Sequence, residues 1–153
     1  MNLLQSHDGP SAGSSCRQRG SVLVIDDDPW IRSVIAEFLA DGGYSVTEAG
    51  DGSSGLDLAK RLQPDVILLD LALPMRSGLE VLQRLKARQP TREIPVIVVS
   101  AYAMLLIGEH AGRADGGVHK PIDLRQLLDH VNGLVRQAHP RFRLLPPTAL
   151  AQR

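Results

Sequence analysis

The chain has 153 residues, of which 43% are hydrophobic and 22% are charged. This length suits one domain with a core of its own and is short for two. No apolar run approaches the ~20 residues that cross a membrane, and the N-terminus lacks the charged start and long apolar stretch of a secretory signal. The lone cysteine, Cys16, excludes an internal disulfide and a multi-cysteine zinc site, which makes a reducing cytoplasm the expected compartment.

The formal net charge is zero, but the charges are unevenly distributed. Residues 21–137 hold 12 basic and 16 acidic residues, whereas residues 138–153 hold three arginines and no acid. Residues 21–137 carry a net negative charge, which repels the phosphates of nucleic acid. The whole chain has only five aromatic residues, too few for a surface on which bases stack. We therefore expect no direct DNA binding and no membrane association.

Both ends differ in composition from the middle. Residues 1–20 are rich in Ser and Gly and have too little apolar surface to offset the entropy of ordering, which predicts a disordered leader. Residues 138–153 contain three prolines, which no helix accommodates, so an extended tail is expected there. The globular domain is therefore predicted over 21–137.

Short apolar runs along 21–137 predict strands, and those rich in β-branched residues and leucine are typical of strands buried on both faces. The predicted strands cover 22–25, 44–48, 66–69, 96–99 and a short fifth strand at about 118–119. Apolar residues at helical spacing predict a helix after each strand, of which the helix near 102–113 is the least regular. The boundary signals are Pro29 after Asp28, the pair Gly42 and Gly43, the capping box of Ser77 and Glu80, and Asp123 as an N-cap.

Five such β-α units predict an α/β fold with a parallel sheet and right-handed crossovers. Five strands in about 117 residues suit a doubly wound, flavodoxin-like sheet with strand order 2-1-3-4-5 and helices on both faces.

Polar residues stand at the carboxyl ends of these strands, where such sheets bind ligands. Asp26 and Asp27 follow the first strand and Asp70 the third, and these strands are neighbours in the predicted order. Crowded carboxylates repel one another, and Mg²⁺, which prefers carboxylate and phosphate oxygens, would relieve that repulsion. Ser100 and Lys120, after the fourth and fifth strands, are suited to holding a phosphoryl group, and an aspartate can be the nucleophile that accepts one.

Over 21–137 the chain resembles the receiver domains of bacterial two-component response regulators. The resemblance is carried by VLVIDDDPWIR, PDVILLDLALPMRSGLEVL, IPVIVVSA and HKPID, in the family's order and at suitable spacing. It implies a phosphorelay protein that accepts a phosphoryl group from a histidine kinase or a histidine phosphotransfer protein, with Mg²⁺ as cofactor. Beyond its own phosphorylation and slow dephosphorylation, no enzymatic activity is implied.

The resemblance also implies a role for each matching residue. Asp70 is the phospho-acceptor, Ser100 stands in place of the switch serine or threonine, and Lys120 stands in place of the family's lysine. Asp27 binds the metal directly, and Asp26 acts on it largely through water. The implied metal set is Asp26, Asp27, Asp70 and the backbone carbonyl of Ala72.

Two features depart from the family pattern. Gly117 stands three residues before Lys120, where the family usually has a Tyr or Phe that rotates on phosphorylation. The stretch from Ser100 to Lys120 is about two residues shorter than usual. Without the aromatic ring, a signal would have to travel through Ser100 and backbone shifts.

Three hypotheses stay open. The first is a stand-alone response regulator without an output domain, acting through a partner protein, a relay or homodimerisation. The second is a receiver-like interaction module that phosphorylation does not control. The third, a remote alternative, is an aspartate-nucleophile phosphatase of the haloacid-dehalogenase type, whose motif Asp26 and Asp28 match in part but Trp30 breaks.

Overall fold

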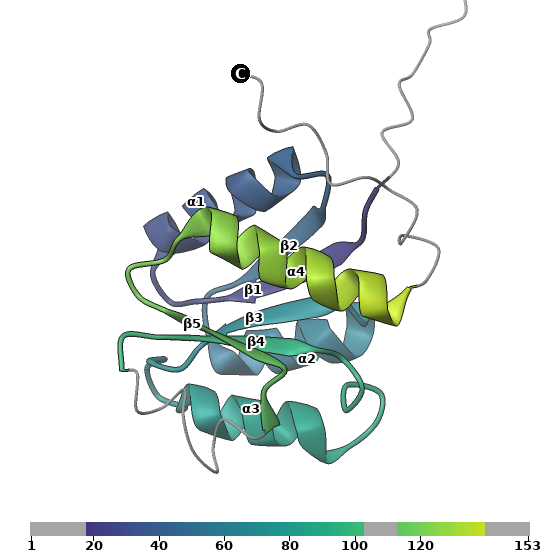
Figure 1. Ribbon diagram of the computed structural model, residues 1–153. Helices are drawn as coiled ribbons and strands as arrows, with labels where there is room; N and C mark the ends of the chain where they lie inside the picture. The colour runs from purple at the N-terminus through teal and green to yellow at the C-terminus, as the bar shows by residue number, and fades with distance from the viewer. Residues whose placement is uncertain (1–17, 103–112, 140–153) are drawn as a thin grey trace, which may run out of the picture.

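The computed structural model describes residues 18–102 and 113–139, which form one sheet between two layers of helices (Figure 1). In chain order the elements are β1 (Ser21–Ile25), α1 (Pro29–Asp41), β2 (Ser45–Ala49), α2 (Gly52–Leu62), β3 (Val66–Asp70), α3 (Gly78–Ala87), β4 (Val96–Ser100), β5 (Gly116–His119) and α4 (Leu124–Ala138). The helix predicted near 102–113 lies almost wholly outside the described residues. Within the described ranges, no helix has the length and apolar character that crossing a membrane requires.

All strand pairings are parallel, and the order is β2-β1-β3-β4-β5. The predicted doubly wound, flavodoxin-like sheet is thereby confirmed. The central strand β3 pairs with its neighbour β1 in a register that places Ile25 opposite Leu69. The residues that follow this pair, Asp26 and Asp70, therefore reach the same edge of the sheet side by side.

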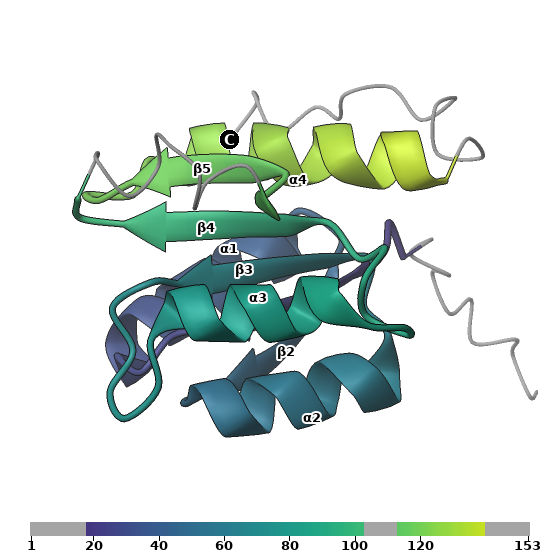
Figure 2. The same ribbon diagram turned by 90° about the horizontal axis from the view of Figure 1, so that it is seen from below.

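Helices cover both faces of the sheet, α1 and α4 on one face and α2 and α3 on the other (Figures 1 and 2). The strands supply both cores because their side chains alternate. In β3, Ile67 and Leu69 pack with α2 and α3, whereas Val66 and Leu68 pack with α1 and α4. Every residue of β3 and β4 is buried, as the apolar runs predicted.

Each observed strand differs from its predicted range by one or two residues, and the starts of β2 and β5 have a clear physical reason. β2 begins at Ser45, one residue later than predicted, because the backbone amide of Tyr44 donates to the carbonyl of Leu39 in α1 (3.1 Å). The Tyr44 side chain is buried beneath α1 and α4, where its hydroxyl donates to Oδ1 of Asn132 (2.6 Å). β5 begins earlier than predicted, at Gly116, because its backbone pairs with β4 although glycines carry no strand pattern.

The helix start predicted at Pro29 and the N-cap predicted at Asp123 are confirmed. The side chain of Asp28 caps α1, and like that of Asp123 it accepts two backbone N–H groups. Of the capping box predicted for α3, the part of Ser77 is confirmed and the part of Glu80 is wrong. Ser77 accepts a first-turn amide as expected, but Glu80 pairs instead with Arg84 across one helical turn (3.1 Å).

Candidate functional site

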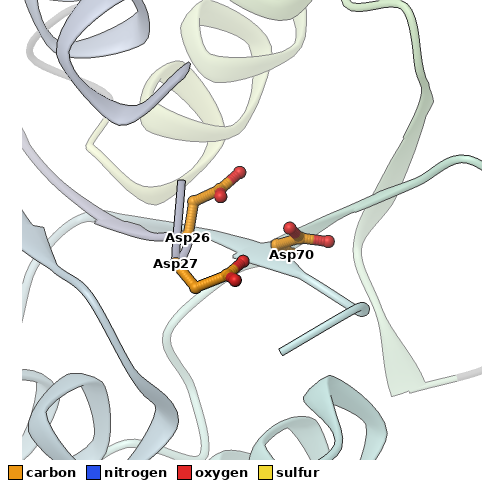
Figure 3. A group of neighbouring side chains, drawn as sticks. All are labelled: Asp26, Asp27 and Asp70. Atoms are coloured by element: carbon orange, nitrogen blue, oxygen red, sulfur yellow. The ribbon is translucent and has the colours of Figure 1, made fainter. Parts of the chain in front are cut away.

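Three aspartates meet at the carboxyl end of the sheet (Figure 3). Asp26 and Asp27 follow β1, and Asp70 is the last residue of the adjacent β3. One carboxylate oxygen of each lies within 4.8 Å of the other two. Asp26 and Asp70 are each 3% exposed, whereas Asp27 is exposed to solvent. The structure thus joins two buried carboxylates and one accessible carboxylate in one cluster.

Backbone amides orient the two buried carboxylates. The amide of Asp28 donates to Oδ1 of Asp26 (2.8 Å), and the amide of Ala72 donates to Oδ1 of Asp70 (2.9 Å). Each bond spans two residues, so it forms as the chain turns out of its strand. The second bond also places Ala72 directly beside the cluster.

Lys120 brings a cation to the cluster from the loop after β5. Its Nζ lies 3.0 Å from Oδ2 of Asp70 and 3.7 Å from Oδ2 of Asp26. Its backbone amide donates to the carbonyl of Ser100 (2.9 Å), which ties the ends of β4 and β5 together. Burial acts to lower the pKa of Lys120, but the hydrogen bond and charge of Asp70, with the charges of Asp26 and Asp27, outweigh it and raise that pKa. The side chain is therefore an ammonium at neutral pH.

Asp26 shows the electrostatic imbalance of the cluster. Burial raises the pKa of Asp26, and the charges of Asp70 and Asp27 raise it further, against the lowering effect of the Asp28 amide and Lys120. Three carboxylates facing one ammonium leave an excess of negative charge on hard oxygen donors. This donor set fits a divalent cation such as Mg²⁺.

Ser100 ends β4 and is 2% exposed. Its Oγ accepts the amide of Tyr102 (3.0 Å) and, in the described part of the chain, forms no hydrogen bond with the three carboxylates. The structure therefore places Ser100 at the edge of the site, bonded to its own loop.

Arg32 of α1 adjoins the site, although the sequence analysis did not single it out. Its Nη1 donates to the carbonyl of Asp26 (2.7 Å), and its Nε lies 3.4 Å from Oε1 of Glu48 in β2. The sequence held one sign of this contact, because Arg32 lies in the first turn of a predicted helix, where the helix dipole disfavours positive charge. Such a placement indicates acceptor groups nearby.

An apolar groove of ≈ 380 Å³ adjoins the cluster on the α1 side. It is lined by Trp30, Ile31, Val34 and Ile35 of α1 and by Lys120, Pro121, Ile122 and Leu124 from the loop after β5 and the start of α4. Trp30 is 74% exposed at this groove. Because Lys120 belongs to both the groove and the cluster, a molecule in the groove would lie next to the carboxylates.

Residues 22–132 match the response regulator receiver domain. The chain is 40% identical over 119 residues to the DNA-binding dual master transcriptional regulator RpaA of Synechocystis sp., covering 76% of this chain and 49% of that protein. It is 33% identical over 122 residues to the polar-differentiation response regulator DivK of Brucella ovis, covering 77% and 98%. The chain spans about half the length of several curated relatives that it matches.

Solved structures agree with these relatives. The receiver domain of the Francisella response regulator 1452 is 30% identical, with a TM-score of 0.72 over 78% of this chain and 99% of that chain. The chemotaxis response regulator CheY4 of Vibrio cholerae is 26% identical, with a TM-score of 0.69 over 74% and 97%. The chain belongs to the family of response regulator receiver domains.

Proposed function

We propose that this receiver is a working phospho-acceptor of a two-component phosphorelay, with Asp70 as the acceptor and a phosphohistidine of a kinase or phosphotransfer protein as the donor. The observation that carries the proposal is the setting of the Asp70 carboxylate. The Ala72 amide holds one of its oxygens and Lys120 holds the other, while Asp26 and Asp27 lie beside it. The proposal concerns the receiver itself, whatever output it serves.

In the proposed transfer, a carboxylate oxygen of Asp70 attacks the phosphorus of the phosphohistidine. The phosphorus–nitrogen bond breaks, the imidazole leaves with the electron pair, and an acyl phosphate forms on Asp70. The ammonium of Lys120, already 3.0 Å from Oδ2, would turn from the carboxylate to the phosphoryl oxygens as their charge arrives. The reaction is a single transfer to the protein and not a turnover of substrate.

The residues proposed to hold Mg²⁺ are Asp26, Asp27, Asp70 and the carbonyl of Ala72. When bound, the cation would supply positive charge to the carboxylates and to the entering phosphoryl group. Asp27 is suited to bind the cation directly because its carboxylate is exposed, whereas the carboxylate of Asp26 is buried and already bonded to an amide.

The response is proposed to begin at Ser100. Its hydroxyl is bonded to the backbone of Tyr102 and lies at the end of the strand next to β3. A phosphoryl group on Asp70 brings new acceptor oxygens, and we expect Ser100 to exchange its Tyr102 partner for one of them. Gly117 has no ring to follow this movement, so the change would pass through the backbone after Ser100.

The groove beside Lys120 supports a protein donor. Its walls are apolar and include Lys120, whose Nζ reaches Asp70, so a donor seated there would bring its phosphohistidine toward Asp70. Exposed Trp30 is the aromatic side chain best placed to anchor such a partner.

The test is the intact mass of the full chain after incubation with acetyl phosphate, with and without Mg²⁺. We expect the mass of one phosphoryl group to be added in the presence of Mg²⁺ and not in its absence. The Asp70→Asn variant should show no gain, and Asp57→Asn, at an exposed position of α2, should behave like the parent. A folded parent chain that gains no mass would refute the proposal.

A second candidate function is favoured by Gly117, which lacks the aromatic half of the family's switch. On that hypothesis the receiver binds its partner equally well with and without phosphoryl, and equal affinities for the two forms would support it. The phosphatase alternative is weaker, because Asp28 of its motif caps α1 by accepting the amides of Trp30 and Ile31. Turnover of a generic phosphate ester would revive it.

A further inference from the structure

Three elements converge on Arg32. Its side chain leaves the first turn of α1 and points back toward the helix N-terminus, as long helical side chains do. There Nη1 donates to the carbonyl of Asp26 at the end of β1 (2.7 Å), and Nε lies 3.4 Å from Glu48 at the end of β2. A Cβ placed on Gly50 would lie 3.4 Å from Nη1, so the guanidinium also packs against the backbone that follows β2.

The position of Asp27 depends on this backbone. Its carboxylate forms no hydrogen bond or ion pair with any other described residue, so only its main chain aims it at the cluster. The peptide that leads into Asp27 begins with the Asp26 carbonyl that Arg32 holds. On the far side, the Asp28 amide is fixed by the Asp26 carboxylate (2.8 Å). The turn is therefore fastened on both sides of Asp27, once by Arg32 and once by Asp26.

We propose that Arg32 is a positioning residue for the metal site: by holding the Asp26 carbonyl, it keeps Asp27 in place to bind Mg²⁺. The inference rests on the proposed function, since it takes the aspartate cluster to be the Mg²⁺ site. The Glu48 carboxylate serves this arrangement by keeping the guanidinium directed toward the turn. Nη1 makes the hydrogen bond to the carbonyl, whereas Nε makes none with the described residues, so Glu48 acts on the guanidinium through its charge. One ammonium at that distance would serve both groups less well.

The charge of Arg32 and its proposed positioning role predict opposite changes in Mg²⁺ affinity when Arg32 is removed, so the direction of the change tests the proposal. A cation near three carboxylates competes with Mg²⁺, so its removal should strengthen Mg²⁺ binding if charge were its only contribution. If Arg32 positions the turn, its removal should weaken Mg²⁺ binding, since loss of an outer-sphere partner typically lowers metal affinity about ten- to a hundredfold.

The experiment is a calorimetric titration of the full chain with Mg²⁺, comparing the parent with Arg32→Met and Arg84→Met. Arg84 is an exposed arginine of α3 that pairs with Glu80, so its variant removes the same charge away from the site. We expect the dissociation constant for Mg²⁺ to rise about ten- to a hundredfold in Arg32→Met and to stay unchanged in Arg84→Met. Arg32→Lys, which keeps the charge, should recover part of the loss.

Acetyl phosphate labelling of the same variants, at Mg²⁺ concentrations that saturate each, provides a second readout. A residue that acts only through metal placement should leave the labelling rate at saturating Mg²⁺ within a fewfold of the parent rate.

Should Arg32→Met fail to fold, Glu48→Gln keeps the arginine but loosens it and should raise the dissociation constant for Mg²⁺ by a smaller factor. An unchanged or lower constant in a folded Arg32 variant would overturn the inference, whereas a parent chain that binds no Mg²⁺ would overturn the proposed function itself.

Discussion

Nζ of Lys120 lies 3.0 Å from Oδ2 of Asp70, although Lys120 follows β5 and Asp70 ends β3, and β4 separates these strands in the sheet. The ammonium reaches across the end of β4, where its own backbone amide is bonded to Ser100. The Lys120 ammonium thus lies beside the Asp70 carboxylate, which both an incoming phosphoryl group and a divalent metal would have to approach.

This placement predicts opposite effects of Lys120→Met on two measurements. Mg²⁺ should bind more tightly, because the competing ammonium has gone. Phosphorylation by acetyl phosphate should slow by about 10²–10³-fold, because the phosphoryl oxygens lose a preorganised positive charge. Calorimetry and the labelling rate measure the two effects, and Lys60→Met, at an exposed position of α2, is the control. An unchanged labelling rate would remove Lys120 from the proposed transfer.

Asp26→Asn should stabilise the metal-free chain at neutral pH. The folded-state pKa of Asp26 is raised, mainly by burial, so the folded chain binds more protons than the unfolded chain between the ordinary value of 3.8 and the raised one. Stability is therefore lost as the pH rises through that window, and an amide, which keeps the bond to the Asp28 amide, avoids the loss. We expect the midpoint of thermal unfolding to rise by a few degrees, as about 1 kcal/mol would produce in a domain of this size.

The comparison is made in a chelator at pH 7 and again below pH 3.8, where the carboxyl group is protonated in both states and the difference should vanish. Added Mg²⁺ should stabilise the parent more than the variant. A variant less stable than the parent at pH 7 would show that the cluster is not under electrostatic strain.

Much of the fold could be predicted because its signals are local. The apolar runs of β3 and β4 indicate strands buried on both faces, and the N-caps Asp28 and Asp123 need only their own first turns. The start of β5 could not be predicted, since Gly116 and Gly117 have no side-chain pattern and become strand only by pairing with β4.

The candidate site also has features that the sequence predicts and features that only the packing determines. Its aspartates and Lys120 follow from strand ends and strand order, which place them at one edge of the sheet. That Asp26 is buried and its neighbour Asp27 exposed depends on the path of the turn after β1. The contact of Arg32 with Glu48 depends on how α1 lies against β2, and nothing in either segment alone specifies that packing.

Gly78→Ala should destabilise the chain and disturb Asp70, whereas Gly133→Ala should stabilise it. A Cβ on Gly78 would lie 2.3 Å from the carbonyl oxygen of Asp70 and 2.5 Å from Cα of Leu71, both backbone atoms with little room to move. A Cβ on Gly133 in α4 meets nothing within 4 Å. Urea unfolding should show a loss of about 2 kcal/mol or more for the first and a gain of up to about 1 kcal/mol for the second.

The same pair of glycine variants tests the link between packing and chemistry. Gly78→Ala should also lower the phosphorylation rate under conditions where the variant is still folded, because its methyl group pushes on the main chain of Asp70. Gly133→Ala should label like the parent. If both label alike, the approach of α3 to β3 at Gly78 serves stability only.

Trp30→Ala should separate protein donors from small ones. Acetyl phosphate does not need the groove, so its labelling rate should stay within about twofold of the parent. Transfer from a phosphorylated kinase or phosphotransfer protein should slow at least about tenfold, since truncation of an aromatic anchor commonly costs about 2 kcal/mol of binding.

Leu62→Ala is the matched control, because Leu62 is 48% exposed but lies on α2, which covers the opposite face of the sheet from α1. Equal slowing by both variants would indicate a general loss of fold, and no slowing by either would place the donor on another surface. The predicted result, a loss confined to Trp30 and to the protein donor, would identify the groove as the docking site of that donor.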